Sequence, residues 1–101
     1  MTQDSAAFTE ATGPSRAAID AALRAVLVDV LALDSVRVSS FDGDTGLFGH
    51  LPELDSMAVA TLLTEIEDRL NITIDDDEVD GEMLESYGAL LAFVETKAIL
   101  G

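Results

Sequence analysis

Residues 54–70 read LDSMAVATLLTEIEDRL. The apolar residues of the other segments are spaced so that they can pack against one face of this stretch. Apolar residues recur from Ser56 onward at the spacing of one side of a helix, which predicts an amphipathic helix over residues 56–70. Its core face is formed by Val59, Leu62, Leu63, Ile66 and Leu70. A loop rich in Gly and Asp ends where this helix begins, so we expect Ser56 to be exposed at the positive end of the helix.

The opposite side of this helix carries a mixed surface. Its residues are Met57, Ala60, Thr61, Thr64, Glu65, Glu67 and Asp68. A purely solvated face has no need of an exposed Met57, whose soft side chain suits a surface that meets several partners. An ordinary surface methionine, half-covered by the preceding loop, is the other interpretation.

Three further helices are predicted. Ser15 caps the first, over residues 16–33, with a core face of Ile19, Leu23, Val26, Leu27, Val30 and Leu31. A short helix over residues 79–85 follows an acidic run and buries Val79, Met83 and Leu84. Ser86 caps the last helix, which has a core face of Tyr87, Leu90, Leu91 and Val94.

The remaining segments are a tail and a long connection. Residues 1–14 are small, polar and aperiodic, and are predicted to form a disordered tail. Residues 34–54 also lack a period, but scattered apolar residues indicate that this loop is pinned onto the helices, with a helical turn at 45–48. The sequence thus predicts an all-α fold: a four-helix bundle over residues 15–101 with a long first loop and a short third helix.

Composition limits the classes of partner. The chain has 101 residues, enough for one domain, with 5 Lys and Arg against 20 Asp and Glu and a formal net charge of −15. This charge repels nucleic acid and anionic lipid and favours partners with basic patches. The chain has no Cys, no secretory signal and no membrane-spanning stretch, so we expect no thiolate metal site, no membrane insertion and a cytoplasmic location.

One pattern in the loop suggests a metal site. Positions 1, 3, 5 and 12 of a calcium-loop register are occupied by Asp42, Asp44, Gly46 and Glu53. Position 6 is Leu47, however, where the geometry needs a glycine. We therefore predict a turn here and no metal site.

The residues around Ser56 resemble the Asp-Ser-Leu attachment motif of acyl carrier proteins. The match is Leu54-Asp55-Ser56-Met57 followed by AVATLL at residues 58–63, and the resemblance covers about residues 15–100. Asp-Ser also occurs at residues 4–5 and 34–35, so the dipeptide alone carries no signal. Only at residues 55–56 does the dipeptide precede an amphipathic helix whose C-terminal half is acidic, with Glu65, Glu67 and Asp68.

The resemblance implies a 4'-phosphopantetheine arm on Ser56, donated from coenzyme A by a magnesium-using phosphopantetheinyl transferase. Asp55 would assist this enzyme and Met57 would pack against it. The mixed surface of the helix, Met57 to Asp68, would bind the transferase and the enzymes that load and transfer acyl groups. The implied function is that of a monomeric carrier, without catalytic groups, that holds acyl groups as thioesters. A phosphodiester at Ser56 also suits the unpaired amides of a first helical turn.

The sequence departs from the family pattern near the serine. Glu53 replaces a common glycine, Met57 a common leucine, and Ala58 and Thr61 are neutral where carriers of fatty-acid synthesis are often acidic. This favours a dedicated pathway over primary fatty-acid synthesis. Residues 46–57, GLFGHLPELDSM, look like a bacterial subgroup associated with exosortase and exopolysaccharide gene clusters.

Three other functions were weighed. A hydrolase using Ser56, His50 and Asp55 would need a base that reaches the serine, and the sole His lies in a loop without a G-x-S-x-G elbow. An acidic helical interaction domain would need Ser56 only as a helix cap. A peptidyl or D-alanyl carrier would share the fold and the arm.

A sequestered acyl chain would need a lining between the second and third helices. Candidate lining residues are Leu62, Ile66, Ile72, Met83 and Leu84. Taken singly, each of them is better explained as ordinary core.

Overall fold

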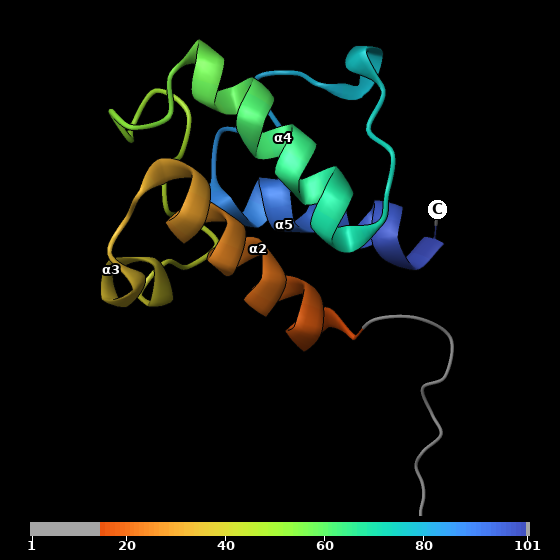
Figure 1. Cartoon of the computed structure of the whole chain (residues 1–101), viewed down its shortest axis with the longest axis horizontal. Helices are drawn as coiled ribbons and strands as arrows, with labels where there is room; N and C mark the ends of the chain where they lie inside the picture. Colours follow the sequence, from red (N-terminus) through yellow and green to blue (C-terminus); the bar gives the residue numbers. More distant parts are fainter. Residues whose placement is uncertain (1–14, 101) are drawn as a thin grey trace, which may run out of the picture.

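The computed structural model describes residues 15–100, and all the elements named in this range are helical (Figure 1). The longer helices are α2 (Arg16–Leu31), α4 (Ser56–Leu70) and α5 (Tyr87–Glu95). The shorter elements are α3 (Ser35–Ser39), the 3-10 turn η1 (Asp76–Glu78) and the π-helical turn η2 (Thr96–Leu100). The all-α prediction is confirmed, whereas the predicted tail, residues 1–14, lies outside the described residues.

Polar caps define where the helices begin. The Ser15 hydroxyl accepts a hydrogen bond from the Ala18 amide at 3.1 Å, as predicted for the start of α2. Ser86 does the same for the Ala89 amide at the start of α5, also at 3.1 Å. Helix α2 ends two residues before the predicted boundary because Ala32 adopts a left-handed conformation, with φ of 55°.

The connection between α2 and α4 is not one continuous loop, because α3 lies within it. The Asp34 carboxylate caps α3 by accepting a hydrogen bond from the Val36 amide at 2.9 Å. Five residues are too few to show a helical period, so the sequence does not predict this element. The turn expected at residues 45–48 lies instead at residues 48–50, where Gly49 has a φ of +89°.

The helix predicted over residues 79–85 is wrong. The helical turn comes earlier, as η1, and residues 81–85 form turns. A capping box explains the shift: the Glu78 carboxylate accepts a hydrogen bond from the Asp75 amide at 2.9 Å, so the acidic run itself becomes the helical turn. Met83 and Leu84 are nevertheless buried, as predicted.

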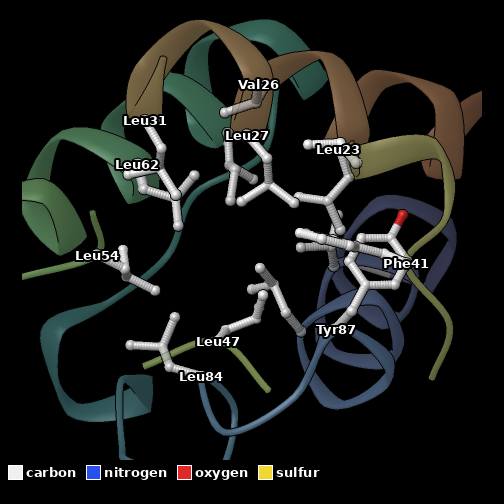
Figure 2. Close-up of a cluster of buried hydrophobic side chains, with 14 of the residues drawn as sticks. Leu23, Val26, Leu27, Leu31, Phe41, Leu47, Leu54, Leu62, Leu84 and Tyr87 are labelled. Atoms are coloured by element: carbon white, nitrogen blue, oxygen red, sulfur yellow. The ribbon is translucent and has the colours of Figure 1, made fainter. Parts of the chain in front are cut away.

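One hydrophobic core joins helices α2, α3, α4 and α5. Helix α2 packs against both α4 and α5, and Figure 2 shows the side chains that meet between them. The core includes three leucines of the connection before α4: Leu47, Leu51 and Leu54. Their burial, at 0%, 7% and 3% exposure, confirms that this segment is pinned onto the helices.

A polar cluster closes one end of this core. The Tyr87 hydroxyl of α5 donates a hydrogen bond to the Asp20 carboxylate of α2. Arg24 donates to the same carboxylate and to the carbonyl oxygens of Val38 and Phe41, at 2.6 and 3.0 Å. Its guanidinium carbon lies 4.6 Å from the centroid of the Tyr87 ring. The cluster therefore ties α2, the end of α3, the chain just after it and the start of α5 together.

Candidate functional site

The start of α4 divides two roles between adjacent residues. Asp55 is the N-cap, and its carboxylate accepts a hydrogen bond from the Ala58 amide at 2.8 Å. Ser56, the first helical residue, is exposed, and its hydroxyl has no hydrogen-bond partner among residues 15–100. Because Asp55 is the cap, the interpretation of Ser56 as a helix cap is wrong. The hydroxyl is left free for chemistry.

The backbone around this hydroxyl suits an anion. Among the described residues, the amides of Ser56 and Met57 have no acceptor, whereas the Ala58 amide is occupied by Asp55. Unpaired amides at the start of a 15-residue helix attract negative charge, which the helix dipole also stabilises. A phosphodiester on the Ser56 oxygen fits this position.

The segment that leads to Ser56 is attached to the start of α5 by a backbone ladder. Four hydrogen bonds of 2.8–3.0 Å form it: Gly88 to Gly43, Tyr87 to Thr45, Leu47 to Glu85 and Phe48 to Leu84. The first rung needs glycine, since a Cβ on Gly88 would lie 2.7 Å from the Gly43 carbonyl oxygen. The loop beside Ser56 is therefore held in place by the backbone itself.

A hollow of about 430 Å³ lies on the loop side of Ser56. It is lined by residues 48–52, Leu54, Asp55 and Ser56. Two large apolar side chains are exposed in this region: Phe48 at 43% and Met57 at 82%. The exposure predicted for Met57 is confirmed, and Phe48 was not singled out by the sequence, where it stands among turn residues.

This hollow contains no catalytic triad. The His50 ring packs against Gly46, where an added Cβ would lie 2.3 Å from the ring carbon Cγ. Among the described residues no hydrogen bond joins His50 to Ser56, and the Asp55 carboxylate is engaged as the cap of α4. Ser56 therefore has no base positioned to activate it within this part of the chain.

A groove of about 420 Å³ opens on the other side of Ser56, between α4 and residues 74–79. Its lining residues are Ser56, Val59, Ala60, Leu63, Thr64, Glu67, Ile74, Asp76 and Val79. The Glu67 carboxylate holds the far wall by accepting a hydrogen bond from the Ile74 amide at 2.6 Å. Lys97 pairs with Glu78 at 2.9 Å and fixes the same wall from η2.

Electrostatics stabilise this wall. The Asp75 amide first, and the Lys97 ammonium second, hold the pKa of Glu78 below its usual value. The lowered pKa keeps the Glu78 carboxylate ionised at neutral pH, and the ionised form is the one that caps η1 and pairs with Lys97.

The predicted partner-binding residues divide into two groups. The exposed group consists of Met57, Ala60, Thr61, Thr64 and Asp68. Glu65 and Glu67 are half-buried and have partners within the molecule. Glu65 pairs with Arg69 at 3.1 Å, and Arg69 also pairs with Asp29 of α2 at 2.8 Å. These two glutamates therefore stabilise the fold itself.

The predicted acyl-pocket residues do not line the groove at Ser56. Leu62 and Ile66 are fully buried between the helices, and Met83 and Leu84 are buried in the same core. Ile72 is half-buried and borders a separate hollow with Thr64, Glu65, Glu67, Asp68 and Thr73. The groove instead uses Val59 and Leu63, which the helical period places on the core face but which are only half-buried.

The calcium-loop register folds as the predicted turn. The Asp42 carboxylate accepts hydrogen bonds from the Asp44 amide at 2.9 Å and the Thr45 hydroxyl at 3.3 Å. Over residues 15–100, no three His or acidic side chains gather in a way that could hold a metal ion. Nor does this range contain a helix of the length and apolar character needed to cross a bilayer.

Comparisons with known proteins agree with this geometry. A family model described as the phosphopantetheine attachment site matches residues 21–94. This is most of the chain, and the chain therefore belongs to the phosphopantetheine-attachment family. Members of this family are carrier domains and not enzymes. The group that they carry covalently is 4'-phosphopantetheine, which is therefore the cofactor of this chain.

A solved structure narrows the class. The chain is similar to the holo acyl carrier protein of Nitrosomonas europaea, determined by solution NMR, with 39% identity and a TM-score of 0.70. The match covers 78% of this chain and 93% of that protein. The chain is thus an acyl carrier protein by family. No curated protein matches its sequence significantly.

Proposed function

We propose that Ser56 is the residue that bears the arm and that the arm carries acyl groups to partner enzymes. The supporting observation is the free, exposed hydroxyl at the first position of α4, next to two unpaired amides. The Ser56 oxygen would accept the phosphopantetheinyl group of coenzyme A, and the helix start would stabilise the resulting phosphodiester. The arm, when attached, supplies a thiol on which cargo is held as a thioester.

A matched control for this assignment lies within the chain. Ser35 also follows a capping aspartate, is exposed and begins a helix, but α3 has only 5 residues. Intact-mass analysis after incubation with coenzyme A and a promiscuous phosphopantetheinyl transferase tests the two serines. Wild type and Ser35→Ala should each gain one phosphopantetheinyl group, and Ser56→Ala none. Modification of Ser56→Ala, or an unmodified wild type, would contradict the proposal.

The groove beside α4 supports acyl cargo over aminoacyl cargo. It begins at Ser56, and its apolar lining includes Val59, Leu63, Ile74 and Val79. An acyl chain placed there would cover apolar surface that is now partly exposed to water, which is favourable. A D-alanyl group has only one methyl group to bury against this lining, and the polar amides of a peptidyl group would lose hydration there.

Chemical shifts of the apo, holo and acylated forms test where the chain goes. Acylation with a medium-length chain should shift Val59, Leu63, Ile74 and Val79, which line the groove. Shifts that extend to the five predicted pocket residues, Leu62, Ile66, Ile72, Met83 and Leu84, would place the chain deeper, in the core. If neither set moves on acylation, the chain is not sequestered.

The electrostatics of the described surface support partners with basic docking patches. All 5 Lys and Arg side chains of the chain lie within residues 15–100, and each one forms an ion pair there. The surplus of carboxylates is therefore left to attract basic surfaces of the transferase and of acyl-handling enzymes. We propose that the carrier acts as a cytoplasmic monomer in a dedicated pathway.

A further inference from the structure

Phe48 separates two hollows on the surface. One is the hollow on the loop side of Ser56, and the other is lined by Phe48, Gly81, Glu82 and Glu85. Phe48 is 43% exposed, whereas Phe41 is only 8% exposed. An aromatic ring thus lies at the surface with the attachment residue on one side and two glutamates on the other.

The backbone ladder presents these groups together. The Phe48 amide donates a hydrogen bond to the Leu84 carbonyl at 2.9 Å, and the Leu47 amide donates one to the Glu85 carbonyl at 3.0 Å. Leu47 and Leu84 are buried in the core, while Phe48 and Glu85 are exposed. Phe48 and the two glutamates are therefore arranged before any partner arrives.

The carboxylates of this region are also available. Among residues 15–100, neither Glu82 nor Glu85 forms an ion pair, and both are exposed. Glu53, by contrast, pairs with Arg37 at 3.3 Å. Asp68 is exposed but lies twelve residues along α4 from Ser56, which is about 18 Å at 1.5 Å per residue.

We propose that Phe48, Glu82 and Glu85, here called the Phe48 patch, form a docking site for the phosphopantetheinyl transferase. The inference rests on the proposed function of Ser56. An enzyme that reacts at the Ser56 oxygen must cover the adjoining hollow, which Phe48 lines. The patch suits an Arg or Lys of this enzyme, because an aromatic face and two carboxylates both attract a cation.

The test is the kcat/KM for modification of Ser56 by a purified transferase with coenzyme A at about 0.1 M salt, where the Debye length is about 10 Å. Glu82→Gln/Glu85→Gln should lower it about tenfold, mainly through KM, and Phe48→Ala should lower it severalfold. Added salt should narrow the gap from wild type for the glutamate variant more than for Phe48→Ala. Asp44→Asn/Asp77→Asn is the matched control, since it removes the same charge from two other exposed carboxylates that lie outside the predicted partner surface of α4. It should stay within about twofold of wild type, because screening weakens charges remote from the contact.

The outcomes separate this proposal from the one on which it rests. If both double variants lose equally, the effect is one of net charge and the Phe48 patch is rejected. Rejection also follows if only the control loses activity, or if Phe48→Ala behaves as wild type. In each of these cases wild type is still modified at Ser56 and the carrier function stands. An unmodified wild type would reject both. Thermal melting of each variant checks that the fold is intact.

Discussion

At the scale of single residues, the two members of the Asp-Ser pair at the start of α4 have different roles: Asp55 caps the helix and Ser56 presents a free hydroxyl. Asp55 satisfies the first-turn amide of Ala58, so the Ser56 hydroxyl needs no partner within the protein. The same pair occurs at residues 34–35, with the same cap, at the start of the short helix α3. Local geometry alone therefore does not distinguish Ser56, the proposed attachment residue, from Ser35. What differs is the position of Ser56 between the loop hollow and the groove.

Removing the cap should destabilise the protein. Asp55→Ala deprives the Ala58 amide of its acceptor, and we expect the free energy of unfolding to fall by about 1 kcal/mol. Asp55→Asn keeps an oxygen at the same place and should cost much less. Urea unfolding followed by circular dichroism measures both variants. Equal losses for Ala and Asn would show that the negative charge, and not the hydrogen bond, matters.

The polar cluster at the end of the core predicts a loss of stability in acid. Partial burial of Asp20 would raise its pKa, but hydrogen bonds from Tyr87 and Arg24 outweigh this and hold the pKa below the usual value of 3.8. The unfolded state then binds the proton more tightly than the folded state. The contribution of Asp20 is therefore present above about pH 4 and is lost as the pH falls below that value.

The measurement is the free energy of unfolding as a function of pH between 2 and 7. Wild type should lose stability on acidification more steeply than Asp20→Asn, because the variant has no carboxylate to titrate at this position. Asp77→Asn, which removes an exposed carboxylate outside the cluster, is the control and should follow wild type. Parallel curves for wild type and Asp20→Asn would contradict the assignment.

At the scale of secondary-structure elements, the backbone ladder fixes the position of the attachment loop. Gly88→Ala would place a Cβ 2.7 Å from the Gly43 carbonyl oxygen and push the loop away from α5. We expect a loss of about 1–3 kcal/mol in unfolding free energy, the usual cost of overpacking. Chemical shifts of residues 43–50 should move, and modification of Ser56 should slow.

Gly81→Ala is the control for this substitution. Nothing lies within 4 Å of a Cβ at Gly81, so the change should be worth less than about 0.5 kcal/mol. If both glycine variants lose stability to the same extent, the loss at Gly88 does not come from contact between the loop and α5, because a Cβ at Gly81 has no atom within 4 Å to meet.

The long helices were predictable and the short elements were not. The period of α2, α4 and α5 extends over several turns, and their polar caps Ser15 and Ser86 are explicit in the sequence. α3 and η1 are shorter than two turns, so their formation depends on caps from Asp34 and Glu78. Ser56 was predicted as the attachment residue because an amphipathic helix follows it. Phe48, Glu82 and Glu85 were missed because a ladder between distant segments brings them together.

At the scale of the whole molecule, self-repulsion should limit stability. The net charge of −15 opposes compaction, and salt screens it, with a Debye length of about 30 Å at 0.01 M and about 3 Å at 1 M. Salt also weakens the ion pairs, but mostly exposed pairs contribute less than about 1 kcal/mol each. We therefore expect the melting temperature to rise with NaCl concentration. A melting temperature that stays constant or falls would contradict this balance.

The internal pairing of all 5 Lys and Arg side chains also governs how copies of this carrier behave toward each other. Over the described surface, one copy has no unpaired cation to offer to the carboxylates of the next. A loaded and an unloaded carrier therefore repel each other, which should slow direct transfer of an acyl group from the thioester of one to the free thiol of the other. We expect such transfer to need an enzyme with a basic surface, which would place its direction under enzymatic control.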